Sequence, residues 1–230
     1  RTGGRVYHMT QHGFARDMEF SLLSQNENEI WFELHWDEST LEKYPYAFIL
    51  RAGYRIEENR VTVLWQVENP GTETLHFSIG GHPAFNCPPE EGTEQTDCFL
   101  DFGPVKEVLS TGISKNGLAT SREDSYPLKN GLLPLTENLF DRDALVIENH
   151  QTDTAALCRK DGTRYITVTM DAPLFGIWSP PGKKAPFVCI EPWYGRCDSE
   201  DFEGTLEERK WGNQAAPGET WEASYTIQAE

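Results

Sequence analysis

Alternating apolar and polar residues recur along most of this chain, and that period of two predicts β-strands. β-branched and aromatic residues concentrate in the same runs, as is typical of strands. Short segments rich in glycine, proline, asparagine and aspartate separate the runs, and they predict turns. The clearest predicted strands are Glu29–Trp36, Tyr46–Ile56, Arg60–Glu68, Thr74–Ile79, Ala144–Glu148, Tyr165–Met170, Phe175–Trp178, Phe187–Glu191 and Thr220–Gln228.

Long segments with helical periodicity are scarce, so the pattern indicates an all-β fold, either an antiparallel β-sandwich or a barrel. Short helical turns are expected within Ser39–Lys43 and Ser199–Glu208. The runs Arg60–Glu68 and Thr74–Ile79 flank an Asn-Pro-Gly-Thr turn, which predicts a hairpin. No repeat or linker divides the sequence, and we therefore expect a single domain over residues 1–230.

Charge and cysteine content narrow the classes of partner and compartment. The 230 residues carry a formal net charge of −17, which argues against nucleic acid and anionic membrane surfaces as partners. No run of about 18 apolar residues exists, so no membrane span is expected. The five cysteines form no Cys-x-x-Cys pair, and no glycosylation sequon is present. These features favour free thiols in a reducing cytoplasm.

The first candidate for chemistry is the segment Phe77–Asn86, in which His82 follows two glycines and precedes a proline. Glycines at a strand end permit backbone conformations closed to other residues and leave room for a ligand. Pro83 restricts His82 to extended geometry. An imidazole held beside open space suits proton transfer near neutral pH. A purely structural role for His82 in a turn remains the alternative.

A second segment, Gln11–Asp17, supplies groups for polar recognition. His12 and Arg16 flank a glycine there. A guanidinium donates in a fixed fork and an imidazole can donate or accept, so together they suit a polar ligand. Arg16 could equally form a surface ion pair with Asp17 or Glu19.

The predicted strand Phe187–Glu191 delivers Glu191 at its end, directly before a proline and two aromatic residues. A carboxyl that enters a partly apolar site has a raised pKa and becomes a usable general base. Trp193 and Tyr194 offer flat apolar faces of the kind that pack against sugar rings. An ion pair between Glu191 and Arg196 is the structural alternative.

Two acids, Asp141 and Asp143, precede the predicted strand Ala144–Glu148, where they could bind ligand hydroxyls or cap a turn. Other chemistries lack their motifs. The chain has no His-Glu-x-x-His, no Gly-x-Ser-x-Gly and no phosphate-binding glycine loop. We therefore expect neither a metal nor a nucleotide cofactor.

In their order along the chain, these motifs resemble those of the aldose 1-epimerase (mutarotase) family, especially its LacX-like bacterial branch. The resemblance covers essentially the whole chain. It implies a galactose-mutarotase-like antiparallel β-sandwich. It also implies cofactor-independent interconversion of the α and β anomers of a small-molecule sugar, a hexose or hexose phosphate. The motifs that carry it are Gln11–Asp17, Tyr44–Tyr46, Gly80–Pro88, Pro134–Thr136 with Leu139 and Phe140, and Glu191–Trp193.

The family resemblance also implies roles for individual residues. His82 matches the general acid and Glu191 the general base, while His12 matches a histidine that binds sugar hydroxyls. Asp143 matches a substrate-binding aspartate, with Asp141 as a rival. The residues fit this chemistry, since ring opening needs one base at the anomeric hydroxyl and one acid at the ring oxygen.

Family members usually carry several strands before the Gln-His-Gly motif, which begins at residue 11 here, so we expect N-terminal strands to be missing. A non-catalytic sugar-binding protein on the same fold is the alternative function, because a fold does not fix a function. A glycoside hydrolase is less favoured, since such enzymes use two carboxylates. If the sugar carries a phosphate, Arg16, Arg51 and Arg196 are the basic candidates to bind it.

Overall fold

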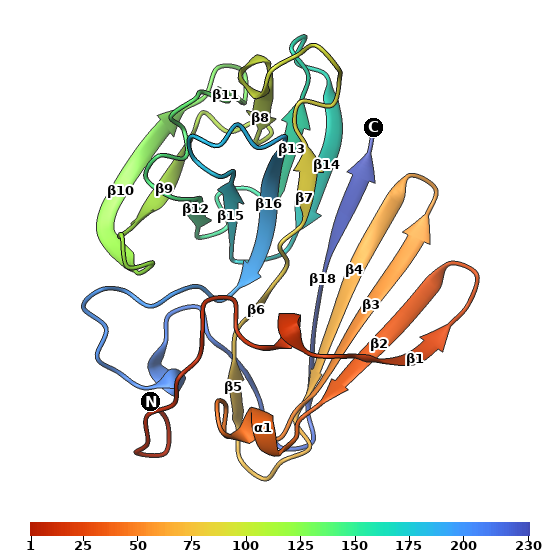
Figure 1. Ribbon diagram of the computed structural model, residues 1–230, viewed down its shortest axis with the longest axis vertical. Helices are drawn as coiled ribbons and strands as arrows, with labels where there is room; N and C mark the ends of the chain where they lie inside the picture. The colour runs from red at the N-terminus through yellow and green to blue at the C-terminus, as the bar shows by residue number, and fades with distance from the viewer. The chain divides into compact units, whose positions relative to one another are not determined.

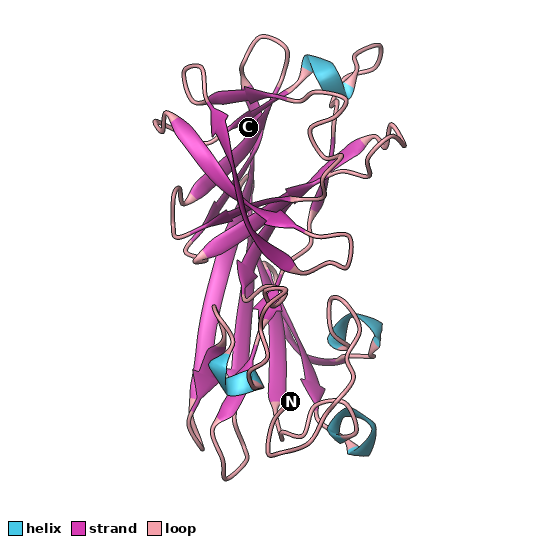
Figure 2. Cartoon of the chain, turned by 90° about the vertical axis from the view of Figure 1, so that its left-hand side faces the viewer, coloured by secondary structure: helices cyan, strands magenta, loops and turns pink.

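The computed structural model describes residues 1–230 and consists mainly of β-strands and the loops between them. Strands take up 46% of the residues and helices 6%, which confirms the predicted all-β class (Figure 2). The α-helix α1 (Glu38–Leu41) overlaps the helical turn predicted within Ser39–Lys43, and the side chain of its N-cap, Asp37, accepts a hydrogen bond from the backbone N–H of Thr40. None of the helices has the length and apolar character needed to cross a membrane.

The chain divides into two compact units. Unit 1 comprises Arg1–Ser78 and Glu203–Ser224, and unit 2 comprises Ile79–Phe202 and Tyr225–Glu230. The strand β18 (Thr220–Ala229) therefore begins in unit 1 and ends in unit 2 (Figure 1). The single domain expected from the sequence stays a prediction.

Unit 1 is built from consecutive antiparallel hairpins. Its elements are η1 (Ala15–Asp17), β1 (Ser21–Gln25), β2 (Glu29–His35), α1, β3 (Ile49–Glu57), β4 (Arg60–Glu68), β5 (Leu75–Phe77), η3 (Leu206–Glu208) and β17 (Asn213–Ala215). The main sheet has the order β1-β2-β3-β4 and continues with β18, while β5 pairs separately with β17. Alternate residues of β4, namely Val63, Trp65 and Val67, are buried, as the period of two predicts.

The predicted hairpin between Arg60–Glu68 and Thr74–Ile79 is wrong. β4 pairs with β3 and β18, whereas β5 pairs with β17. Asn69, directly after β4, accounts for the difference. Its side-chain amide donates to the backbone oxygens of Glu73 and Ala215, each at 2.8 Å. The Asn-Pro-Gly turn is thereby tied to the end of β17 and does not fold β5 back onto β4.

Unit 2 contains two antiparallel sheets that share one core. Its elements are β6 (Ile79–Gly80), β7 (Ala84–Asn86), η2 (Gln95–Asp97), β8 (Phe99–Asp101), β9 (Glu107–Ile113), β10 (Ala119–Pro127), β11 (Leu132–Pro134), β12 (Leu145–Glu148), β13 (Thr154–Cys158), β14 (Arg164–Met170), β15 (Leu174–Trp178) and β16 (Phe187–Tyr194). One sheet has the order β10-β9-β12-β15-β16-β6, and β7 also pairs with β16. The other runs from the end of β18 through β14, β13 and β8 to β11. Phe102, directly after β8, and Phe175 of β15 are both buried, with ring centroids 6.4 Å apart, so the two sheets form the predicted sandwich.

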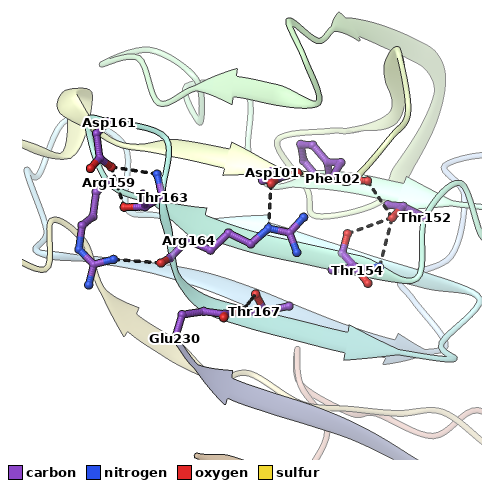
Figure 3. Close-up of polar contacts among 11 residues, drawn as sticks. Asp101, Phe102, Thr152, Thr154, Arg159, Asp161, Thr163, Arg164, Thr167 and Glu230 are labelled. Atoms are coloured by element: carbon purple, nitrogen blue, oxygen red, sulfur yellow. Dashed lines mark hydrogen bonds and ion pairs between the residues drawn. The ribbon is translucent and has the colours of Figure 1, made fainter.

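Side chains reinforce the sheet that contains β14 (Figure 3). Arg164 of β14 donates from Nε to Oδ2 of Asp101 in β8 at 2.8 Å. Thr167, also in β14, donates from Oγ1 to Oε1 of Glu230 at 2.8 Å. These contacts join segments far apart in the sequence, so this sheet is held by side chains as well as by its backbone ladder.

Candidate active site

β16 carries the predicted base, Glu191, in the middle of a buried sheet. Its neighbours are β15 on one side and the short strands β6 and β7 on the other, and the five residues Val188–Pro192 are all buried. Side chains alternate between the two faces of a strand, so Cys189, Glu191 and Trp193 share one face. Pairing on both edges fixes the register of these three side chains.

The connection Gly81–Pro83 interrupts the strand pairing along β16. Before it, Gly80 of β6 pairs with Trp193, and after it Ala84 of β7 pairs with Cys189. The backbone N–H of Gly81 donates to the oxygen of Pro192 at 3.0 Å, and the N–H of Ile190 donates to the oxygen of Pro83 at 3.3 Å. The connection is therefore anchored at both ends on the part of β16 that contains the predicted base.

This anchoring brings His82 and Glu191 together, and we refer to them as the acid–base pair. Nε2 of His82 lies 3.5 Å from Oε1 of Glu191. The histidine side chain is 45% exposed and the glutamate side chain only 4%, so a ligand would reach the pair from the histidine side. Trp178 of β15 stands edge-on to the imidazole, with ring centroids 6.4 Å apart.

Burial dominates the electrostatics of Glu191. It raises the pKa of this carboxyl from an ordinary 4.5 to about 8, because a charge in the sandwich loses its hydration. A hydrogen bond from Nε1 of Trp193 to Oε2, at 3.3 Å, lowers the pKa, and the negative charge of Asp143 raises it. The indole engages one carboxylate oxygen and leaves the other facing His82, so this side chain can exchange a proton in mildly alkaline solution.

Two glycines make room for the indole of Trp193. A Cβ atom on Gly176, in the neighbouring strand β15, would lie 2.4 Å from Cζ2 of the ring. A Cβ atom on Gly80 would lie 2.9 Å from Cδ1. Both distances are far below van der Waals contact, so the ring occupies the space that side chains at these positions would need. The glycines thereby help to aim the indole N–H at Glu191.

Asp143, and not Asp141, is the acid that acts on Glu191. Its carboxylate accepts a hydrogen bond from the backbone N–H of Ala144 at 2.7 Å, just before β12. Its backbone φ of 88° lies in a region that non-glycine residues seldom occupy, which is common at functional sites. Its charge contributes to the raised pKa of Glu191. The carboxylate of Asp143 therefore bonds to the backbone directly before β12, and its negative charge also acts on Glu191.

The predicted alternative of an ion pair between Glu191 and Arg196 is wrong. Nε of Arg196 donates to Oε1 of Glu148 at 2.5 Å, and these side chains are only 4% and 5% exposed. The buried carboxylate of Glu148, at the end of β12, thus forms the ion pair with Arg196, which follows β16. Arg51 of unit 1, the second phosphate candidate, is also engaged, with its guanidinium 2.8 Å from Glu68.

His12 and Arg16 lie in unit 1, before β1. His12 is exposed and has a positive φ of 69°. Arg16 belongs to η1, and its Nε lies 3.4 Å from Oδ1 of Asp17, with both side chains largely exposed. The surface ion pair considered as an alternative for Arg16 is therefore present. Sugar binding by these two residues stays a prediction from the sequence.

Three further residues lie close to the acid–base pair or to Trp193, although no sequence motif singled them out: Cys189, Gly176 and Trp178. The period of two that defines the face of Glu191 could have placed Cys189 on it as well. Gly176 and Trp178 had no such signal, because they reach the site through the pairing of β15 with β16. Donor atoms of His82, Cys189 and Glu191 lie within 4.8 Å of one another, so these three residues could hold a metal ion.

Comparisons with known proteins agree with this architecture. A family model described as aldose 1-epimerase matches residues 2–228. The chromosomal protein LacX of Lactococcus lactis subsp. lactis is 33% identical over 221 residues, which cover 94% of this chain and 74% of LacX. A galactose mutarotase related enzyme from Lactobacillus acidophilus has a TM-score of 0.92 at 32% identity, with 99% of this chain and 76% of that chain covered. A galactose mutarotase-like protein from Lactobacillus casei has a TM-score of 0.91 at 27% identity, with 100% and 79% covered.

Proposed function

This chain belongs to the aldose 1-epimerase family, and we propose that it interconverts the α and β anomers of an aldose by general acid–base catalysis. The observation that carries the proposal is the approach of Nε2 of His82 to within 3.5 Å of Oε1 of Glu191. The two oxygens that exchange protons during mutarotation are both bonded to C1 of the sugar. An acid and a base this close together can therefore serve both oxygens of one bound sugar.

In the ring-opening direction, ionised Glu191 takes the proton from the anomeric hydroxyl O1 while protonated His82 gives a proton to the ring oxygen O5. The C1–O5 bond breaks, and C1 becomes the carbonyl carbon of the open-chain aldose. Rotation about the C1–C2 bond then presents the other face of the carbonyl. On closure the roles reverse, because His82 takes the proton back from O5 and Glu191 returns one to O1.

The acid–base pair must carry one proton at the start of each turnover, since one member accepts while the other donates. The raised pKa of Glu191, about 8, keeps its carboxylate basic enough to accept a proton from a hydroxyl. The hydrogen bond from Trp193 steadies the carboxylate when it is charged. The reaction as proposed needs only these proton transfers, so no cofactor takes part in it.

Other residues of unit 2 suit recognition of the sugar. Trp193 and Trp178 place aromatic rings beside the acid–base pair, and such rings pack against the apolar face of a pyranose. Asp143 lies near enough to influence Glu191 through its charge, and its carboxylate could accept hydrogen bonds from sugar hydroxyls. We assign Trp193 and Asp143 to substrate binding on these grounds.

The proposal is tested by measuring anomer exchange of freshly dissolved aldoses by polarimetry or exchange NMR. His82→Asn and Glu191→Gln should each lower the exchange rate about 10²-fold or more, the usual effect of losing a general acid or base. His150→Asn is a matched control, because His150 is an exposed histidine of unit 2 with a positive φ that asparagine tolerates well.

Unchanged rates in both variants, over several aldoses, would overturn the assignment. A protein that binds a sugar without accelerating exchange would instead be the non-catalytic binding protein considered above.

A further inference from the structure

Cys189 is a buried thiol beside the acid–base pair that the proposed reaction does not use. It lies two residues before Glu191 on the same face of β16, and it is 1% exposed. Its strand partners are Trp178 of β15 and Ala84 of β7. His82 lies two residues before Ala84, so the imidazole, the thiol and the carboxylate converge from two segments of the chain.

The separations of the three donor atoms suit a small tetrahedral ion. Bonds of about 2.0–2.3 Å from zinc to nitrogen, oxygen and sulfur place neighbouring tetrahedral ligands roughly 3.4–3.6 Å apart. Nε2 of His82 and Oε1 of Glu191 are already 3.5 Å apart. One donor atom from each of His82, Cys189 and Glu191 lies within 4.8 Å of the other two. A shift of these side chains by roughly 1 Å would therefore bring all three atoms to the spacing of zinc ligands. His82 is 45% exposed, so a water molecule can reach the fourth position.

The kind of donor selects the kind of metal. One imidazole nitrogen, one thiolate and one carboxylate form the mixed set that zinc and its chemical relatives prefer, whereas magnesium and calcium require oxygen ligands. Two potential anions, Cys189 and Glu191, are buried here, and the negative charge of Asp143 acts on the same place. Both groups must lose their protons to act as ligands, and a dication compensates the two negative charges that result.

We propose that a thiophilic divalent cation of the zinc class binds to His82, Cys189 and Glu191 and reversibly inhibits the enzyme. The ion takes the lone pair of the imidazole and the carboxylate oxygen that move protons in the reaction, and the thiol proton leaves to solvent. The inhibition rests on the function proposed above, whereas the binding of the ion does not. The ion would therefore be an inhibitor that competes with protons and sugar for the acid–base pair.

Cobalt(II) is the probe for the site, because a thiolate bound to cobalt gives a charge-transfer band in the near ultraviolet. Titration of the metal-free full chain with Co²⁺ should produce this band at one equivalent, and Zn²⁺ should abolish it. Cys189→Ala and the nearly isosteric Cys189→Ser should both lack the band. Calorimetry should show that Zn²⁺ binds these variants about 10²-fold more weakly than the wild type.

Cys158→Ala is the matched control, because Cys158 is another buried strand cysteine of unit 2. It should keep both the cobalt band and the affinity for zinc. A wild-type band that persists in both Cys189 variants, or no band at all, would overturn the metal site. The surface pair of His35 and Glu33 could bind metal but has no thiolate, so it cannot produce the band.

The activity measurement separates this inference from the proposed function. The Cys189 variants should exchange anomers at close to the wild-type rate and should lose most of their sensitivity to Zn²⁺. If the wild type shows the cobalt band but no exchange activity, the metal site stands and the proposed function fails. If exchange activity is present and zinc does not inhibit it, the function stands and the inhibitory site fails.

Discussion

Replacing Glu191 by glutamine should make the protein more stable in alkaline solution while it removes activity. The native carboxyl holds its proton up to a pKa of about 8, against an ordinary 4.5, because ionisation inside the sandwich is costly. The folded state therefore binds more protons than the unfolded state between these two pH values. The free energy of unfolding falls as the pH rises through that window, and below it the wild type carries no penalty.

The size of the effect follows from the two pKa values. At about 1.36 kcal/mol for each tenfold change in proton affinity, the gap between 4.5 and about 8 corresponds to roughly 5 kcal/mol. Glutamine has the shape of glutamate, carries no charge and can still accept the hydrogen bond from Trp193. Glu191→Gln should thus match the wild type near pH 4.5 and gain several kcal/mol over it above pH 8.

Urea denaturation, followed by tryptophan fluorescence at several pH values in buffer with a chelator, measures this difference. The exposed residue Glu137 supplies the control, because Glu137→Gln makes the same chemical change at the surface and is measured in the same series. A difference between Glu191→Gln and the wild type that is the same at both ends of the pH range would refute the reasoning. It would mean that the ionised carboxylate is stabilised as well in the sandwich as in water.

The same site predicts that anomer exchange in metal-free buffer slows above about pH 8, because the buried carboxyl then loses the proton that the acid–base pair needs for a turnover; a rate that still rises well beyond that pH would contradict this. Arg196→Met should lower the free energy of unfolding by about 3–5 kcal/mol, because it removes the guanidinium that pairs with the buried carboxylate of Glu148, and Glu148→Leu in the same chain should restore much of the loss. Urea denaturation measures both, and a single variant as stable as the wild type would show that the pair is not needed. Gly176→Ala should slow anomer exchange about 10- to 100-fold, because the added Cβ pushes the indole of Trp193 away from the carboxylate of Glu191. Loss of the hydrogen bond from the indole should also shift the fall in rate to higher pH, and an unchanged pH profile would mean that the indole does not affect the pKa of the carboxyl.

Much of the strand content could be predicted from local patterns, because alternation and turn residues act within a few positions. The run Arg60–Glu68 became β4 with the same limits. The pairing of strands could not be predicted in the same way. Asn69 bonds to Ala215, which is 146 positions away, and that contact decides which strand β5 joins. The residues around Asn69 carry no pattern from which a partner as distant as Ala215 could be predicted.

In the candidate site, too, single residues could be identified from the neighbouring sequence, whereas their arrangement in space could not. Glu191 and His82 were found because each carries its own signal, a carboxyl at the end of an apolar run and a histidine between glycines and proline. Their distance from each other depends on the register of β16 against β6 and β7. The partner of Arg196 was missed for a related reason. That partner, Glu148, is the last residue of a strand whose apolar sequence predicts a buried strand and nothing more.

The register of β16 also limits how this protein can change in evolution. Successive side chains of a strand point to opposite faces, so one inserted or deleted residue between Cys189 and Glu191 would place these two side chains on opposite faces of the sheet. Substitutions on the opposite face can accumulate as long as they remain apolar and of similar size. We therefore expect homologous proteins to tolerate differences in composition along this segment and to keep its length unchanged.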